Sequence, residues 1–179
     1  MQKGTAFVVA AFIALMVGAG VSSAAKPEDV FKGKIIITKN RLPMRFSSQG
    51  AFVAALQKNR TDKIWPTEEK GETGSWNIEY IAFFAQPLND SEIQVKFYDI
   101  TGGDRKYVAG DPQYTRERGS RIFGSSIVLA KPEFDVRKHY MMNVESRGRV
   151  LATTQFWLLG KGANYSGKVE FSDQEARQR

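Results

Sequence analysis

The amino-acid sequence predicts an all-β domain: a two-sheet antiparallel β-sandwich with at most one short helix. Most segments between residues 31 and 159 alternate apolar and polar side chains, which is the pattern of half-buried strands. Clusters of turn residues separate these segments into about seven strands. Helical spacing of apolar residues occurs in only one place, residues 47–59.

The N-terminus, residues 1–25, predicts a secretory signal peptide. A basic start precedes the uncharged apolar run of residues 6–18, and Ser23 and Ala25 supply the small residues that cleavage after Ala25 needs. The run is shorter than the roughly 20 apolar residues that span a membrane. We therefore expect no transmembrane segment after cleavage, and a single exported domain, residues 26–179, in the periplasm or outside the cell.

The composition bears on the kind of organism that makes the protein and on the charge of its partners. The chain has no Cys, whereas exported eukaryotic domains commonly carry disulfides, so the sequence favours a bacterial origin. Its formal net charge is +7. Such a charge favours anionic partners, but the Lys and Arg residues are spread along the chain, as on an ordinary solvated surface.

The first part of the exported chain predicts one strand, one helix and a loop. Residues 31–38 contain three consecutive Ile residues and indicate a strand. Residues 47–59 indicate a short helix, capped by Ser48, which we expect to lie over one end of the sandwich. Residues 60–75 are rich in charges and Gly and indicate a loop.

The middle of the chain predicts a strong hairpin followed by weaker strands. Residues 76–86 and 92–100 alternate clearly and are joined by a turn. A short strand at residues 107–109, a loop at 110–119 and a further strand at 120–131 follow.

The late segment predicts a second hairpin, with strands at residues 138–145 and 149–159 and a tight turn at Ser146-Arg147-Gly148. Its register places Tyr140 on the inner face. Residues 168–171 indicate a last edge strand within a loosely ordered C-terminal tail.

The start of this hairpin resembles a known fold class. Phe134 is followed six residues later by Tyr140, at the start of a strand that a tight turn joins to the next. This is similar to the tyrosine corner of immunoglobulin-like sandwiches, in which the Tyr hydroxyl bonds to upstream backbone. The resemblance covers residues 130–160 and lacks the Cys…Trp…Cys signature of that class. It implies an immunoglobulin-like sandwich; the alternative is an up-and-down β-barrel of lipocalin type.

Catalytic and metal-binding residues are not predicted. His139 is the only His and has no nucleophile or Cys to work with. Asp99, Asp104 and Asp111 match ordinary turn chemistry better than a calcium loop. Residues 162–168 match the start of a P-loop, but Val169 stands where Ser or Thr should bind magnesium. We expect no catalytic residue, no metal and no cofactor.

Two groups of residues around the late hairpin are candidate binding residues. Met141, Leu151 and Trp157 are expected on the face opposite Tyr140. If this face is exposed it marks a contact site. The sequence favours a core position instead, with the helix at 47–59 or the strand at 168–171 as its cover.

The second group is basic and could bind an anionic glycan or lipid headgroups. Nucleic acid is not expected, because aromatic side chains are not interleaved with these charges. The basic residues near the hairpin are Arg137, Lys138, Arg147 and Arg149, and those of the preceding segment are Arg116, Arg118 and Arg121.

Together these features predict an exported, non-enzymatic protein of the cell envelope that acts as a structural or protein-interaction module. Its partner would be an envelope protein. The alternative is a binding module for an anionic envelope polymer or lipid, acting through the basic loops. The oligomeric state is not indicated by the sequence.

Overall fold

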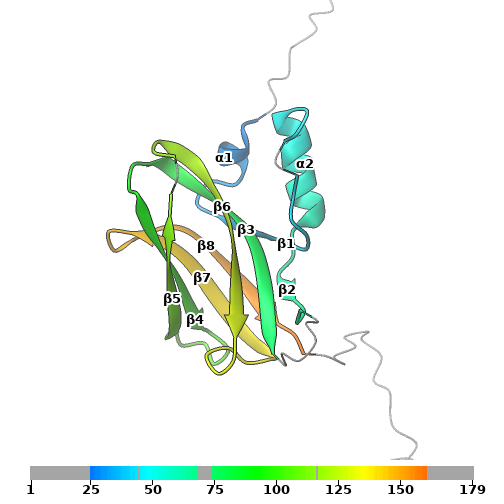
Figure 1. The fold of residues 1–179 in the computed structure, drawn as a ribbon, viewed down its shortest axis with the longest axis vertical. Coiled ribbons are helices and arrows are strands. Elements are labelled where there is room, and N and C mark those ends of the chain that lie inside the picture. The colour runs from blue at the N-terminus through cyan, green and yellow to red at the C-terminus, as the bar shows by residue number, and fades with distance from the viewer. Residues whose placement is uncertain (1–24, 44, 68–73, 116, 161–179) are drawn as a thin grey trace, which may run out of the picture.

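The computed structural model describes residues 25–43, 45–67, 74–115 and 117–160, and these form an all-β sandwich of two sheets (Figure 1). This confirms the predicted fold class, and the described strands divide between two sheets instead of closing one barrel. The three-stranded sheet has the order β1 (Ile35–Thr38), β3 (Ser75–Leu88), β6 (Ser120–Ala130). The five-stranded sheet has the order β2 (Lys63–Ile64), β8 (Arg149–Leu158), β7 (Lys138–Ser146), β4 (Glu92–Asp99), β5 (Lys106–Tyr114).

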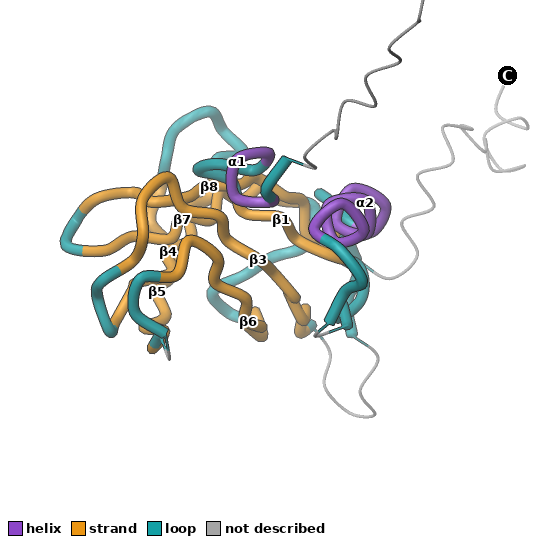
Figure 2. Tube along the Cα trace, turned by 90° about the horizontal axis from the view of Figure 1, so that it is seen from above, coloured by secondary structure: helices purple, strands orange, loops and turns teal. Residues whose placement is uncertain are grey.

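The main core lies between the two sheets and follows the predicted alternation. In β3, Trp76, Ile78 and Tyr80 face inward and are almost fully buried. The facing sheet contributes Tyr140 and Phe156, again from alternate positions of their strands. These large side chains meet between the two sheets. Figure 2 shows the strands of both sheets from above.

A second, smaller core lies on the outer face of the three-stranded sheet. Helix α2 (Gln49–Asn59) packs Leu56 there against Ile36 and Phe83, and both figures show α2 beside β1. Ser48 caps the helix as predicted, by accepting a hydrogen bond from the Ala51 amide at 3.1 Å. The expected position over one end of the sandwich is wrong, because the outer face of this sheet offers the apolar surface that a marginal helix needs.

The structure adds two elements that the sequence did not predict and extends a third. A one-turn helix, α1 (Pro27–Val30), begins with Pro at its first position and acidic residues in its first turn. Strand β2 lies in the expected loop and pairs in parallel with β8. Strand β5 continues to Tyr114 through the expected loop, and Pro112 is tolerated there because β5 is an edge strand.

The late hairpin has the predicted turn, but a bulge shifts part of its register. Arg147 and Gly148 both have positive φ, as a two-residue hairpin turn requires. The pairing slips between Val144 and Glu145, so β8 carries one extra residue there. Val150, predicted inside, is 52% exposed, while Leu151, predicted outside, packs against the main core.

Two predictions fall on residues outside the described ranges. The signal peptide lies almost wholly within residues 1–24, and the strand at 168–171 with its tail lies within residues 161–179. Among the described residues, no helix is both long and apolar enough to cross a membrane.

Candidate functional site

The predicted contact face does not form one exposed apolar patch. Trp157 is 38% exposed, and its ring stacks on that of His139 with a centroid distance of 4.5 Å. Met141 lies on the same face but is buried, and Leu151 belongs to the core side of the bulge. The expected cover is also absent for the described part of the chain, because α2 packs on the other sheet. These three residues are therefore not brought together.

The rest of this outer face is occupied by polar contacts within the sheet. Lys96 pairs with Glu145 at 2.8 Å, and the Thr153 hydroxyl donates to Asn143 Oδ1 at 2.8 Å. Both Asn143 and Glu145 are buried beneath their neighbours. The centre of this face is satisfied within itself and offers little to a ligand.

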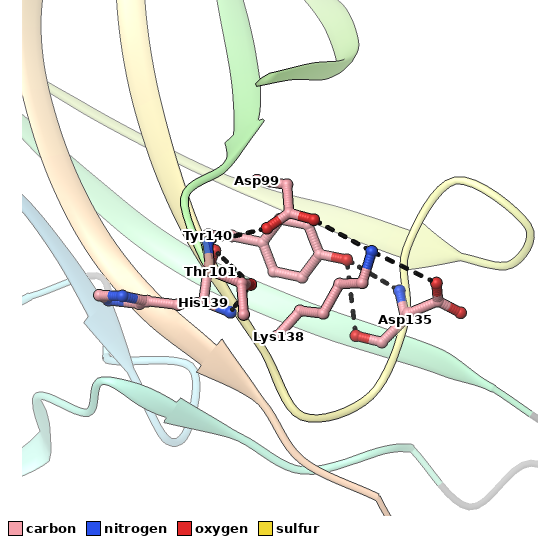
Figure 3. A network of polar contacts seen from close by, with 6 residues as sticks. All are labelled: Asp99, Thr101, Asp135, Lys138, His139 and Tyr140. Atoms are coloured by element: carbon pink, nitrogen blue, oxygen red, sulfur yellow. Dashed lines mark hydrogen bonds and ion pairs between the residues drawn. The ribbon is translucent and has the colours of Figure 1, made fainter. Parts of the chain in front are cut away.

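Lys138, a predicted binding residue, is part of a structural network around the tyrosine corner (Figure 3). The Tyr140 hydroxyl accepts a hydrogen bond from the Asp135 amide at 2.8 Å, which confirms the predicted corner. Lys138 Nζ lies 3.0 Å from Asp99 Oδ2 and 3.6 Å from Asp135 Oδ2. Burial opposes ionisation of Asp99, but hydrogen bonds from Thr101 and Lys138 lower its pKa to about 2. The Lys138 charge is thus used within the fold.

The predicted basic patch is divided between the two ends of β7. Arg137 and Lys138 lie at its start, and Arg147 and Arg149 follow its end. A nine-residue strand is about 30 Å long, so these pairs cannot contact one small ligand. Arg147 also forms an ion pair with Asp90.

The preceding basic segment does not restore such a patch. Arg121 pairs with Asp29 at 3.2 Å and donates from Nε to the Phe84 carbonyl. Arg118 is exposed, and Arg116 lies outside the described residues.

Metal chemistry and His-based catalysis find no support in the described chain. No group of three His, Asp or Glu side chains that could hold a metal ion occurs among the residues in the structure. His139 is half-buried, with its ring against Trp157 and its backbone amide bonded to Thr101. No Ser hydroxyl is bonded to its imidazole in the described part of the chain.

A different site stands out: a groove of about 970 Å³ that runs around the edge of β6. On its outer side the groove combines an apolar cluster with polar and charged residues such as Glu79 and Ser126, and on its inner side it opens into the seam between β5 and β6, where polar groups dominate. The apolar outer residues are Leu42, Phe46, Phe52, Ile81 and Ile122; the main seam residues are Tyr80, Gln113, Thr115, Phe123 and Ser125.

The seam holds a buried polar group without a partner. Ser125 Oγ donates to Gln113 Oε1 at 2.9 Å, and Gln113 Nε2 donates to Asp111. The Tyr80 hydroxyl is buried beneath them and makes no hydrogen bond within the described structure. Burial raises the pKa of Tyr80 well above its usual range. The neighbouring Ser125 hydroxyl acts to lower this pKa, but its own hydrogen bond goes to Gln113. Buried polar groups are normally paired, so this hydroxyl needs an explanation.

β6 is also the least protected of the four sheet edges in the described chain. The β1 edge is covered by residues 59–61, because Thr61 donates to the Ile37 carbonyl and Lys39 to the Asn59 carbonyl. The β2 edge is only two residues long, and β5 carries Pro112. β6 has eleven residues, no Pro and a single charge, Arg121. Long edges without charge or Pro are templates for pairing with another chain.

The pairing of β3 shows which groups of β6 face outward. Phe83 N donates to Lys34 O at 2.9 Å, so the odd-numbered residues of β3 bond towards β1 and the even-numbered ones towards β6. Ser125 lies opposite Tyr80 and therefore bonds to β3. The residues whose N–H and C=O groups point to the open edge are then Ile122, Gly124, Ser126 and Val128.

Sequence reasoning missed this site. The strand itself was predicted, and its scarcity of charge was visible, but which strand ends a sheet depends on the strand order.

Comparison with known proteins adds no identity. No family model and no curated protein matches the chain. Among solved structures, a beta-glucosidase from Kluyveromyces marxianus in complex with glucose matches at 13% identity over 54% of this chain and 14% of that one, with a TM-score of 0.29. A TM-score this low shows neither a common fold nor a common activity.

Proposed function

We propose that this chain is an exported, non-enzymatic protein-interaction module of a bacterial cell envelope, and that its partner binds along β6. The observation that carries the proposal is the open, nearly uncharged edge of β6 beside a groove of about 970 Å³. Natural proteins usually shield such an edge. An edge left open is best explained by a partner that covers it.

Export is supported by the sequence. The apolar run of residues 6–18 and the small residues before Lys26 have the arrangement of a signal peptide. The absence of Cys means that the fold contains no disulfide and needs no oxidising enzyme in the compartment where it matures.

The alternative function, binding of an anionic glycan or lipid, rests on the net charge of +7. It is the weaker candidate because the basic residues of the hairpin lie at opposite ends of β7, and Lys138 and Arg147 are already paired with carboxylates. A partner protein at β6 needs none of these charges.

Site-specific photo-crosslinking in the source organism tests the proposal. Benzoylphenylalanine replaces Val128, an exposed residue of β6, or in a second strain Val150, an equally apolar exposed residue of β8. We expect one discrete protein adduct from position 128 and none from position 150. The mature chain should be recovered in the envelope or extracellular fraction.

Two variants of Ser126 serve as matched controls. Ser126→Pro removes an N–H that faces the open edge. An edge strand tolerates Pro at such a position, so the fold should persist while the adduct at position 128 is abolished. Ser126→Ala keeps that N–H and should leave the adduct unchanged. An adduct that survives Ser126→Pro, or a chain that stays in the cytoplasm, would overturn the proposal.

A further inference from the structure

We infer that the partner adds to β6 as an extended strand that places an apolar side chain beside the outer cluster of Phe46, Phe52 and Ile122 and a hydrogen-bonding side chain beside Ser125 on the seam side. The inference rests on the proposed function, because it specifies how the partner occupies the same edge. It follows from three features of the groove, each argued below.

The first feature is an unused ladder of backbone groups. Gly124, Ser126 and Val128 direct N–H and C=O groups away from β3. Those of Ile122 also face the open edge, but both are bonded to the Ser120 hydroxyl. Within the described residues, β6 pairs with no strand other than β3. A partner strand of about five residues would satisfy these groups, which is the mode of binding called β-strand addition.

The second feature is an apolar cluster on the outer side. Phe46 and Phe52 lie with their rings 4.9 Å apart over the sheet, near Ile122 of β6. These side chains and the neighbouring Leu42 are only half-buried, so they retain apolar surface. Alternate side chains of an added strand point to one face of the sheet, and on this face apolar ones would complete the burial.

The third feature is the polar seam. In the added strand, the residues between those whose side chains face the outer side would point to the inner side of the sheet. Ser125, Gln113 and the unpartnered Tyr80 hydroxyl lie there. A Ser or Thr side chain there can take over the hydrogen bond that Ser125 shares with Gln113, which frees Ser125 to pair with the Tyr80 hydroxyl beneath it. An apolar side chain leaves the Tyr80 hydroxyl unpaired. The seam thus selects a hydroxyl-bearing residue at the partner position beside Ser125, whereas the neighbouring inward residues Phe123 and Ile127 are apolar.

A synthetic peptide of alternating Val and Ser, with one Lys at each end, is the probe. Binding is measured by titration calorimetry against the chain from Lys26 onward, with a peptide of the same composition in a non-alternating order as control. We expect the alternating peptide to bind at least tenfold more tightly. Equal binding of the two peptides, or no binding of the alternating one, would overturn the inference.

Two N-methylated versions of the probe test the ladder directly. One carries N-methyl groups on the Val residues and the other on the Ser residues. An added strand uses the amides of only one set to bond to β6, so one version should lose binding at least tenfold and the other should not. Loss in both or in neither contradicts strand addition. Ser126→Pro should abolish probe binding, and Ser126→Ala should not.

The seam is tested by Tyr80→Phe. This variant should weaken the Val/Ser probe by about three- to tenfold, the range of one hydrogen bond, and should not weaken a Val/Ala probe. A loss of the same size for both probes would contradict a role for the hydroxyl.

Self-association is the competing occupant. If sedimentation shows a dimer that Ser126→Pro dissociates, a second copy covers β6 and the inference is overturned. If no probe binds but the adduct at position 128 still depends on Ser126, strand addition fails while the proposed function stands.

Discussion

At the scale of single residues, two buried tyrosines have opposite environments. The Tyr140 hydroxyl accepts a hydrogen bond from the Asp135 amide, whereas the Tyr80 hydroxyl makes none in the described structure. A buried hydrogen bond stabilises a fold modestly, but a buried polar group left unpaired destabilises it by about 1–3 kcal/mol. The same chemical change at the two positions should therefore have effects of opposite sign.

We predict that Tyr80→Phe raises the free energy of unfolding by about 1 kcal/mol, because it removes an unpaired buried hydroxyl. Tyr140→Phe is the matched control and should lower it by about 1–3 kcal/mol, because the Asp135 amide loses its acceptor. Urea denaturation of both variants measures the effect. A clear loss of stability in Tyr80→Phe would show that this hydroxyl has a partner in the free protein.

Asp99 should make stability depend on pH. Its pKa of about 2 is below its ordinary value of 3.8, so its stabilising contribution is present above about pH 4 and is lost as the pH falls towards 2. Asp99→Asn should lower the free energy of unfolding at pH 7 by about 1–2 kcal/mol, after allowance for partial exposure.

Unfolding free energies at pH 7 and pH 2 check this prediction, with the exposed Asp104→Asn as control. The difference between Asp99→Asn and the parent chain should shrink towards pH 2, because the parent then also loses the charge. A difference that is the same at both pH values would contradict the linkage.

At the scale of elements, the β7–β8 turn depends on its backbone conformation. Gly148 has φ of +74°, in the left-handed region, and the space around its Cα is open. A side chain there is strained by the backbone and not by a clash.

Gly148→Ala should therefore lower the free energy of unfolding by about 1–2 kcal/mol. Gly102→Ala is the matched control: Gly102 is also in open space, but its φ is outside the left-handed region, so the change should be small. Thermal or urea unfolding of both variants gives the comparison. Equal effects would mean that the turn adapts to a different type.

At the scale of the whole molecule, the sequence predicted the fold class from local patterns, and these succeed where pairing partners are adjacent in the chain. The late hairpin, the inward Tyr140 and the Ser48 cap were all predicted in this way. The extension of β5 through Pro112 was missed because Pro is compatible with a strand only at a sheet edge. The immunoglobulin-like topology remains a prediction.

The candidate site was not predictable, because its parts come together only through the order of strands. The bulge in β8 separates Leu151 from Trp157, although simple alternation places them on one face. The basic residues that are neighbours in the hairpin sequence lie at opposite ends of a strand. The groove joins α2, β5 and β6, which are distant from one another along the chain.

The distribution of charge over the whole molecule leads to a last prediction. The net charge of +7 should cause weak retention on vesicles with anionic headgroups at low salt. Because the cations are dispersed, we expect release at about 0.15 M salt, where the Debye length is about 8 Å. Arg149→Ala and Arg118→Ala should weaken retention by similar small factors, as shown by vesicle sedimentation over a salt series. Retention that persists at this salt and is lost only in Arg149→Ala would instead place a specific anion site at the β7–β8 turn, and would favour the alternative function.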